Sequence, residues 1–194
     1  MINWFAVARI GHYFLAEILG PGDTALDGTM GNGYDTLFLA QSVGCQGKVY
    51  AFDIQAQAIQ RTKERLASHG VLDQRIELIQ DGHQNIGKYI KQPIKAAIYN
   101  LGYLPGGNHE IITETETTLR AMNETLNLLV SRGRIVIVVY PGHPGGQQEQ
   151  EAIEQLVSTL DTQKFKVLKL TLFNSPPSAP GVIFIEKAGE KSEN

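Results

Sequence analysis

The sequence predicts an α/β fold in which helices cover both faces of a central, mostly parallel sheet of seven strands. Short apolar runs alternate with amphipathic segments, a pattern typical of parallel strands joined by crossover helices. A glycine-rich turn, Gly28 to Gly33, follows the first strand and precedes a helix. The last two strand-like runs have no helix between them, so they are expected to form a hairpin with at least one antiparallel strand. These three observations favour a Rossmann-like sheet with a C-terminal strand hairpin.

Helices are expected where apolar residues recur three and four positions apart. The first ends before Pro21, because proline and glycine interrupt a helix there. The second is expected to begin with Asp35 as its N-cap. The expected helices cover residues 2–19, 35–40, 55–70, 113–129 and 149–160.

Strands are expected in short β-branched runs bounded by Gly, Pro, Asp or Asn. The run RIVIVVY, residues 134–140, is the richest in β-branched residues and is expected to be a buried central strand. Residues 1–187 are expected to form one domain, and 188–194 a polar tail. The expected strands cover residues 24–27, 48–54, 75–80, 95–99, 134–140, 165–173 and 182–187.

Composition excludes several classes of protein. A chain of 194 residues that is 42% hydrophobic has enough apolar surface to fold, and the single cysteine, Cys45, excludes a disulfide scaffold. No apolar run approaches the ~20 residues of a membrane span, and no signal peptide is recognisable, so a cytoplasmic protein is expected. The net charge of −3 argues against a broad cationic face that coats nucleic acid, although not against a local basic patch.

Polar residues follow five of the predicted strands. Asp27 ends the first and Asp53 the second, Asp81-Gly82-His83 closes the third, Asn100 follows the fourth, and Tyr140 to His143 follow the fifth. Ligands of open α/β sheets bind outside the carboxyl ends of the strands. Five such ends in register therefore predict a single functional site.

The glycine turn and the second acid predict a nucleoside cofactor. Gly31 and Gly33 allow a tight turn and a close approach of the backbone to a ligand. Asp53 follows Gly33 by twenty residues, the spacing at which a carboxylate meets ribose hydroxyls.

The details of the turn favour S-adenosylmethionine over a nicotinamide dinucleotide. Thr36 replaces the third glycine of a dinucleotide fingerprint. Asp35 is badly placed for a pyrophosphate, and Asp27 suits a cationic, zwitterionic ligand. A nicotinamide-dependent oxidoreductase stays as an alternative from a different class, and a noncatalytic S-adenosylmethionine-binding protein as a more distant one.

Four segments resemble a bacterial family described as rRNA methylases, whose members are tied to methylation of the aminomethyl group on the wobble uridine of tRNA. The resemblance covers nearly the whole chain, and its last two glycine-rich signatures do not occur in methyltransferases generally. It implies the class I methyltransferase fold with S-adenosylmethionine as cofactor. The segments are DGTMGNGYDTLFLA at 27–40, NLGYLPGG at 100–107, YPGHPGG at 140–146 with Glu149, and IEK at 185–187.

The resemblance also implies cofactor contacts. Tyr34 departs from the family pattern, where histidine or asparagine is usual, and so do Asn108-His109 and the link at 175–181. Asp81 and His83 are expected to recognise the adenine. The contacts implied by the resemblance are Asn32, the Tyr34 position, Asp53, Gln55, Gly82 and His83.

Methylation of an amine requires a neutral nitrogen, so a proton acceptor is expected. His143 is the first candidate because histidine titrates near neutrality, with Tyr103 and Tyr140 as alternatives. Asn100 is expected to hold the incoming amine. His12 and Cys45 are interpreted as structural, and no residues have the spacing of a metal site.

The resemblance implies that the substrate is 5-aminomethyl-(2-thio)uridine at the wobble position, in the anticodon stem-loop of tRNA. A chain this short and acidic suits recognition of a local RNA element better than of a whole tRNA. An rRNA or small-molecule methyltransferase is the alternative. Exposed helix faces suggest a homodimer.

Overall fold

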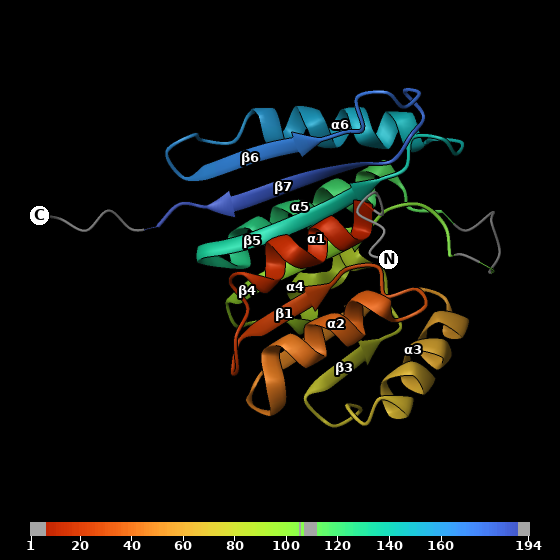
Figure 1. The fold of residues 1–194 in the computed structure, drawn as a ribbon, viewed down its shortest axis with the longest axis vertical. Helices are drawn as coiled ribbons and strands as arrows, with labels where there is room; N and C mark the ends of the chain where they lie inside the picture. The colour runs from red at the N-terminus through yellow and green to blue at the C-terminus, as the bar shows by residue number, and fades with distance from the viewer. Residues whose placement is uncertain (1–6, 105, 107–111, 190–194) are drawn as a thin grey trace, which may run out of the picture.

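The computed structural model describes residues 7–104, 106 and 112–189. One seven-stranded sheet runs through the molecule in the order β3-β2-β1-β4-β5-β7-β6 (Figure 1). Strands β1 to β5 run parallel to one another, and β7 lies antiparallel between β5 and β6. The predicted α/β fold and its terminal hairpin are confirmed.

The elements follow the predicted alternation. The strands are β1 Thr24–Asp27, β2 Lys48–Phe52, β3 Ile76–Ile79, β4 Ile94–Asn100, β5 Leu129–Val139, β6 Phe165–Leu170 and β7 Gly181–Lys187. The α-helices are α1 Val7–Ala16, α2 Tyr34–Val43, α3 Ala56–Ser68, α4 Ile86–Tyr89, α5 Thr115–Leu128 and α6 Gly146–Ser158.

Each face of the sheet has its own core. Side chains alternate along a strand, so in β5 Ile135, Ile137 and Val139 join one apolar cluster while Val136 and Val138 join the other. The first cluster packs against α4, α5 and α6, and the second against α1, α2 and α3 (Figure 1). The predicted burial of this β-branched run is confirmed, since residues 135–139 are all at most 2% exposed.

Two predictions about the elements need correction, and one short helix was not predicted. The first helix ends at Ala16, earlier than predicted, and its predicted first residues lie outside the described part of the chain. Asp35 is not an N-cap: Gly33 caps α2 in the left-handed region, and Asp35 lies in the first turn. A short helix, α4, follows β3 where the apolar pattern was too short to predict one.

Candidate active site

A large cavity of about 1410 Å³ opens at the carboxyl edge of the parallel strands. It is larger than a typical small-molecule pocket of roughly 300–1,000 Å³, so it has room for a nucleoside cofactor and part of a second substrate. Of the predicted site residues, two do not line it, Asp27 and Gly33. Those that do are Gly31, Asn32, Tyr34, Asp35, Asp53, Gln55, Asp81, Gly82, His83, Asn100, Tyr103, Tyr140 and His143.

The glycine turn is held in a fixed shape by its neighbours. Gly33 has φ +77°, and a Cβ there would lie 2.8 Å from the backbone of Thr62 on α3. Arg65 Nε donates to the Asn32 carbonyl (2.7 Å), and Arg61 donates to the Asn32 side chain (2.9 Å). Gly33 therefore shapes the turn from behind, while Gly31 and Asn32 face the cavity.

Asp53 links the turn to the end of β2. One carboxylate oxygen accepts from the Gly31 N–H (3.0 Å), and the other accepts from the Gln55 N–H (2.9 Å). Burial raises the pKa of Asp53 above its ordinary value. Each oxygen retains a second lone pair, so the group can also accept from hydroxyls of a ligand.

Asp27 lies behind the cavity wall and is completely buried. Its carboxylate accepts from Thr36 Oγ1 (2.6 Å) and from the Thr29 N–H (3.1 Å). This geometry offers no direct contact with a ligand, in contrast to the sequence-based expectation. Burial, reinforced by the nearby Asp35 carboxylate, raises the pKa of Asp27 to about 8.

This shift predicts a pH dependence of stability. The Asp27 carboxyl ionises near 3.8 when unperturbed and near 8 in the folded protein, so the folded state binds its proton more tightly. The free energy of unfolding should therefore fall as pH rises from about 4 to 8. Urea unfolding at several pH values should show that Asp27→Asn loses less stability than the wild type across this window. Equal slopes for the two proteins would contradict the assignment.

The loop after β3 forms another wall of the cavity. Asp81 accepts from Asn85 (2.8 Å) and from Tyr89 Oη (2.9 Å), and these bonds lower its pKa. His83 is buried, and its Nδ1 bonds the Gly28 carbonyl (3.2 Å). Burial lowers the pKa of His83, which favours a neutral imidazole that donates to this carbonyl.

A connected polar cluster crosses the cavity between α1, α2 and β4. Asp35 binds His12 Nε2 through one carboxylate oxygen and the Asn100 side-chain amide through the other. Tyr140 Oη donates to Asn100 Oδ1 at 3.4 Å. His12, which the sequence suggested was structural, therefore lines the cavity in contact with a predicted site residue.

His143 packs tightly beside this cluster. Its Nδ1 donates to the Pro144 carbonyl (2.9 Å), while Nε2 is buried with no hydrogen-bond partner among the described residues. A Cβ added at Gly146 would lie 2.9 Å from this nitrogen, and one at Gly102 3.5 Å from it. The Nε2 lone pair is thus shielded by the two glycines, which does not favour direct proton transfer in this conformation.

Tyr140 is also poorly suited to accept a proton. Burial raises the pKa of its hydroxyl above the ordinary value of 10.0, and the negative charge of Asp35 adds to this effect. The group is therefore a hydrogen-bond donor near neutral pH. Tyr103 is 43% exposed, and its ring lies edge-on to His143 with the centroids 6.4 Å apart.

Glu149 joins the two signature loops beside the cavity. Its buried carboxylate accepts from Thr118 Oγ1 (2.6 Å) and Thr113 Oγ1 (2.7 Å). Thr113 Oγ1 in turn accepts from the Gly102 N–H (2.9 Å). The 108–109 pair lies outside the described residues, and from the 175–181 link Ser178 reaches the cavity.

The charge of the cavity lining suits a cationic ligand. Among its described residues are four carboxylates, Asp35, Asp53, Asp81 and Glu114, against one arginine, Arg9. A dinucleotide pyrophosphate would be repelled by this lining, whereas a sulfonium would be attracted. In the described part of the chain, no three His, Cys, Asp or Glu residues are grouped so that they could hold a metal ion.

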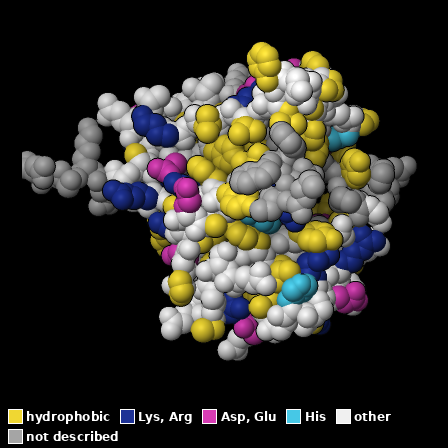
Figure 2. Space-filling view, viewed as in Figure 1, with side chains coloured by type: hydrophobic (Ala, Val, Ile, Leu, Met, Phe, Trp, Pro, Cys, Tyr) yellow, Lys and Arg dark blue, Asp and Glu magenta, His cyan; other side chains and the backbone are white. Residues whose placement is uncertain are grey.

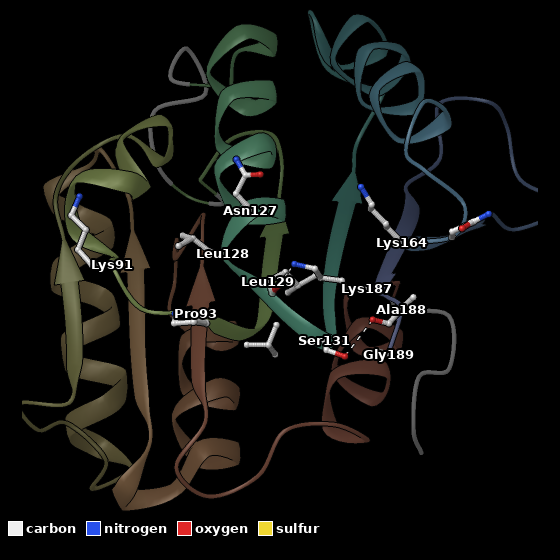
Figure 3. A pocket seen from close by; sticks show the side chains of 12 residues that line it. Lys91, Pro93, Asn127, Leu128, Leu129, Ser131, Lys164, Lys187, Ala188 and Gly189 are labelled. Atoms are coloured by element: carbon white, nitrogen blue, oxygen red, sulfur yellow. Dashed lines mark hydrogen bonds between the residues drawn. The ribbon is translucent and has the colours of Figure 1, made fainter. Parts of the chain in front are cut away.

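A second, smaller cavity of about 510 Å³ lies at the opposite edge, near the starts of β4 and β5 (Figure 3). Three lysines line it, but Lys187 donates to the Leu129 carbonyl (2.6 Å) and Lys91 binds the Gly87 carbonyl.

On the face seen in Figure 2, the described Lys and Arg side chains lie in small groups among acidic, apolar and neutral ones. Among the described helices, none has the length and apolar character needed to span a bilayer.

Comparison with known proteins identifies the family. Residues 49–186 match the family described as Putative rRNA methylase. The chloroplastic tRNA (mnm(5)s(2)U34)-methyltransferase of Arabidopsis thaliana is 37% identical over 188 residues, which cover 92% of this chain and 68% of that protein.

Two crystal structures are similar over nearly their whole length. A putative rRNA-methylase from Clostridium thermocellum has a TM-score of 0.91 at 40% identity and covers 96% of this chain and 100% of its own. A putative methyltransferase from Streptococcus mutans in complex with SAH has a TM-score of 0.85 at 40% identity, covering 96% and 99%. These relatives decide against the oxidoreductase alternative. The chain belongs to the putative rRNA methylase family and is an S-adenosylmethionine-dependent methyltransferase.

Proposed function

We propose that the protein transfers a methyl group from S-adenosylmethionine to the amine of 5-aminomethyl-(2-thio)uridine at the wobble position of tRNA. The observation that carries the proposal is a single acidic cavity. It is lined on one side by the glycine turn bonded to Asp53, and on another by the polar cluster that contains Asp35 and Asn100. The name of the Arabidopsis relative, which spans most of this chain, supports this choice of substrate over rRNA or a small molecule.

The cofactor would occupy the half of the cavity over β1 to β3. Asp53 would accept from the ribose hydroxyls, the backbone at Gly31 and Asn32 would lie against the cofactor, and Gly82 and His83 would border the adenine. Tyr34, Gln55 and Asp81 would complete this wall, since all three line the cavity. S-adenosylmethionine supplies an activated methyl group, so the protein mainly aligns the amine and excludes water.

Asp53 gives the most direct test of this placement. We expect Asp53→Ala to weaken S-adenosylmethionine binding by about 1–3 kcal/mol, the scale of a lost charged hydrogen-bond partner. Calorimetric titration measures the affinity, and thermal unfolding shows whether the variant is folded. Exposed Asp73 is a matched control, because it pairs with Arg75 away from the cavity. An unchanged affinity in folded Asp53→Ala would place the ribose elsewhere.

The substrate amine would enter over β4 and β5. Asn100 lies at the end of β4 in contact with Asp35, and would orient the amine toward the sulfonium methyl. Tyr103, Tyr140 and His143 surround this part of the cavity. Half-exposed Tyr103 is suited to stack on an unstacked base.

An isolated anticodon stem-loop tests whether the protein recognises a local element of tRNA. We expect an isolated anticodon stem-loop carrying 5-aminomethyl-(2-thio)uridine to be methylated, because a short chain with a net charge of −3 has little surface for wider RNA contact. Incorporation of labelled methyl into the stem-loop, compared with full-length tRNA, measures this. Modification of full-length tRNA alone would contradict local recognition.

The remaining sequence predictions belong to this proposal as well. We propose that residues 1–187 act as one methyltransferase domain, in the cytoplasm, as a homodimer. Analytical ultracentrifugation of the full chain tests the oligomeric state.

A further inference from the structure

His12 is fixed in the cavity by helix packing. α1 packs against β5, β7, β4 and α2, which carries His12 to the carboxyl edge of the sheet. The imidazole lies flat on the Phe38 ring of α2, with centroids 4.0 Å apart and planes 5° from parallel. The ring therefore has one defined orientation, with about a quarter of its side chain exposed.

The contact with Asp35 determines which nitrogen carries a proton. A carboxylate only accepts hydrogen bonds, so His12 Nε2 donates to Asp35. The second oxygen of Asp35 is held by the Asn100 amide, which fixes the carboxylate between the two side chains. In the neutral ring the lone pair is then on Nδ1, and Asp35 is placed to stabilise the imidazolium that forms when Nδ1 takes a proton.

The other charged groups near α1 are an arginine on the helix itself and a group of ion pairs at its far end. Arg9 lines the same cavity one turn earlier on α1, and Asp27 and Tyr140 interact electrostatically with Asp35. At the other end of α1, Arg134 of β5 pairs with Glu17 and with Glu186 of β7. Among the described residues that line this cavity, Arg9 is the one lysine or arginine against four carboxylates, so the lining as a whole is acidic, which suits acceptance of a proton.

We propose that His12, supported by Asp35, accepts the proton that the substrate ammonium must lose before methyl transfer. This inference rests on the proposed function, because it requires a primary amine as the methyl acceptor. One N–H bond of the ammonium breaks and its proton binds His12, directly or through one water. The freed nitrogen lone pair then forms the N–C bond while the C–S bond breaks, and the sulfur keeps the electron pair. Asp35 and Asn100 act as positioning residues for this step.

The geometry favours His12 over His143. His143 Nε2 is buried between Gly102 and Gly146, and its other nitrogen is used by the Pro144 carbonyl. His12 instead lies beside the residue predicted to hold the amine, through the shared carboxylate of Asp35.

The test compares His12→Ala with His12→Gln. Glutamine keeps an N–H donor for Asp35 but cannot accept a proton near neutral pH. Single-turnover methyl transfer to the aminomethyl-uridine stem-loop is measured from pH 6 to 9.5 with both substrates saturating. We expect both variants to lose about 10²–10⁴-fold in rate at pH 7, the usual range for a general base. The deficit should shrink as pH rises, because more of the substrate amine is already neutral.

Two controls and three results decide the inference. His69→Gln, an exposed substitution on the α3 side of the molecule, should retain the wild-type rate, and calorimetry should show unchanged cofactor affinity in His12→Gln. A near-wild-type rate for His12→Gln, or a deficit independent of pH, would reduce His12 to a positioning role and overturn the inference alone. A wild type that transfers no methyl group to this amine would overturn the proposed function together with the inference. Because glutamine preserves the contact with Asp35, it keeps the test valid if His12→Ala does not fold.

Discussion

Asn100→Ala is expected to lower the rate of methyl transfer by about 10²–10³-fold, the scale on which an oriented polar group in an active site contributes. The Asn100 side chain connects two members of the polar cluster in the cavity, because its amide binds Asp35 and its oxygen accepts from Tyr140. Its backbone N–H donates to Thr29 Oγ1 (2.7 Å), so the alanine variant can keep the main-chain contact. The loss should therefore appear in kcat and leave cofactor affinity nearly unchanged.

Single-turnover rates with saturating stem-loop and S-adenosylmethionine measure this effect. Asn123→Ala is a matched control, because Asn123 is exposed on α5 and its side chain donates to the Leu119 carbonyl of its own helix. A fall in RNA affinity with an unchanged single-turnover rate would show that Asn100 binds RNA without orienting the amine.

Gly33→Ala is expected to damage both stability and cofactor binding. The substitution places a Cβ at φ +77° and 2.8 Å from the Thr62 backbone, so it combines backbone strain with a clash between α2 and α3. We expect a loss of about 2–5 kcal/mol in the free energy of unfolding. Displacement of the turn should also weaken S-adenosylmethionine binding by about tenfold or more, the scale of one or two lost hydrogen bonds.

Gly70→Ala separates the two contributions. Gly70 has φ +67°, but a Cβ there meets nothing within 4 Å, so it carries the strain without the clash. It should cost about 1–2 kcal/mol in the free energy of unfolding and leave cofactor affinity unchanged. Denaturant unfolding and calorimetric titration measure both quantities. Equal effects of the two substitutions would show that contact with Thr62 does not shape the turn.

The position of the site at the carboxyl edge of the sheet was predictable from the sequence, because parallel strands bring their carboxyl ends together. Asp53 and Asn100 are far apart in the chain, yet both follow apolar runs and both line the cavity. The terminal hairpin was predictable for a similar local reason, since no helix separates its strands. These features depend on the order of elements and not on details of packing.

The parts that could not be predicted depend on how elements pack. His12 lies on a helix that precedes the strand–helix alternation, and nothing in its spacing shows that α1 crosses β5 with His12 at the cavity. Asp35 matches an N-cap by residue type, but Gly33 takes that place because the turn needs a left-handed residue against Thr62. Asp27 ends a strand at the edge where the site lies, yet its carboxyl group is buried behind the cavity lining and accepts hydrogen bonds from Thr29 and Thr36. Hydrogen-bond partners of this kind are visible only in three dimensions.

Nucleoside mass analysis of modified tRNA tests the central claim most directly. tRNA that carries 5-aminomethyl-2-thiouridine at the wobble position is incubated with the full chain and S-adenosylmethionine bearing a deuterated methyl group. The nucleosides are then separated and weighed. The proposed function predicts one labelled methyl on the wobble nucleoside, located on its aminomethyl nitrogen by fragmentation. Label on any other nucleoside, or transfer to rRNA with none to this tRNA, would contradict it.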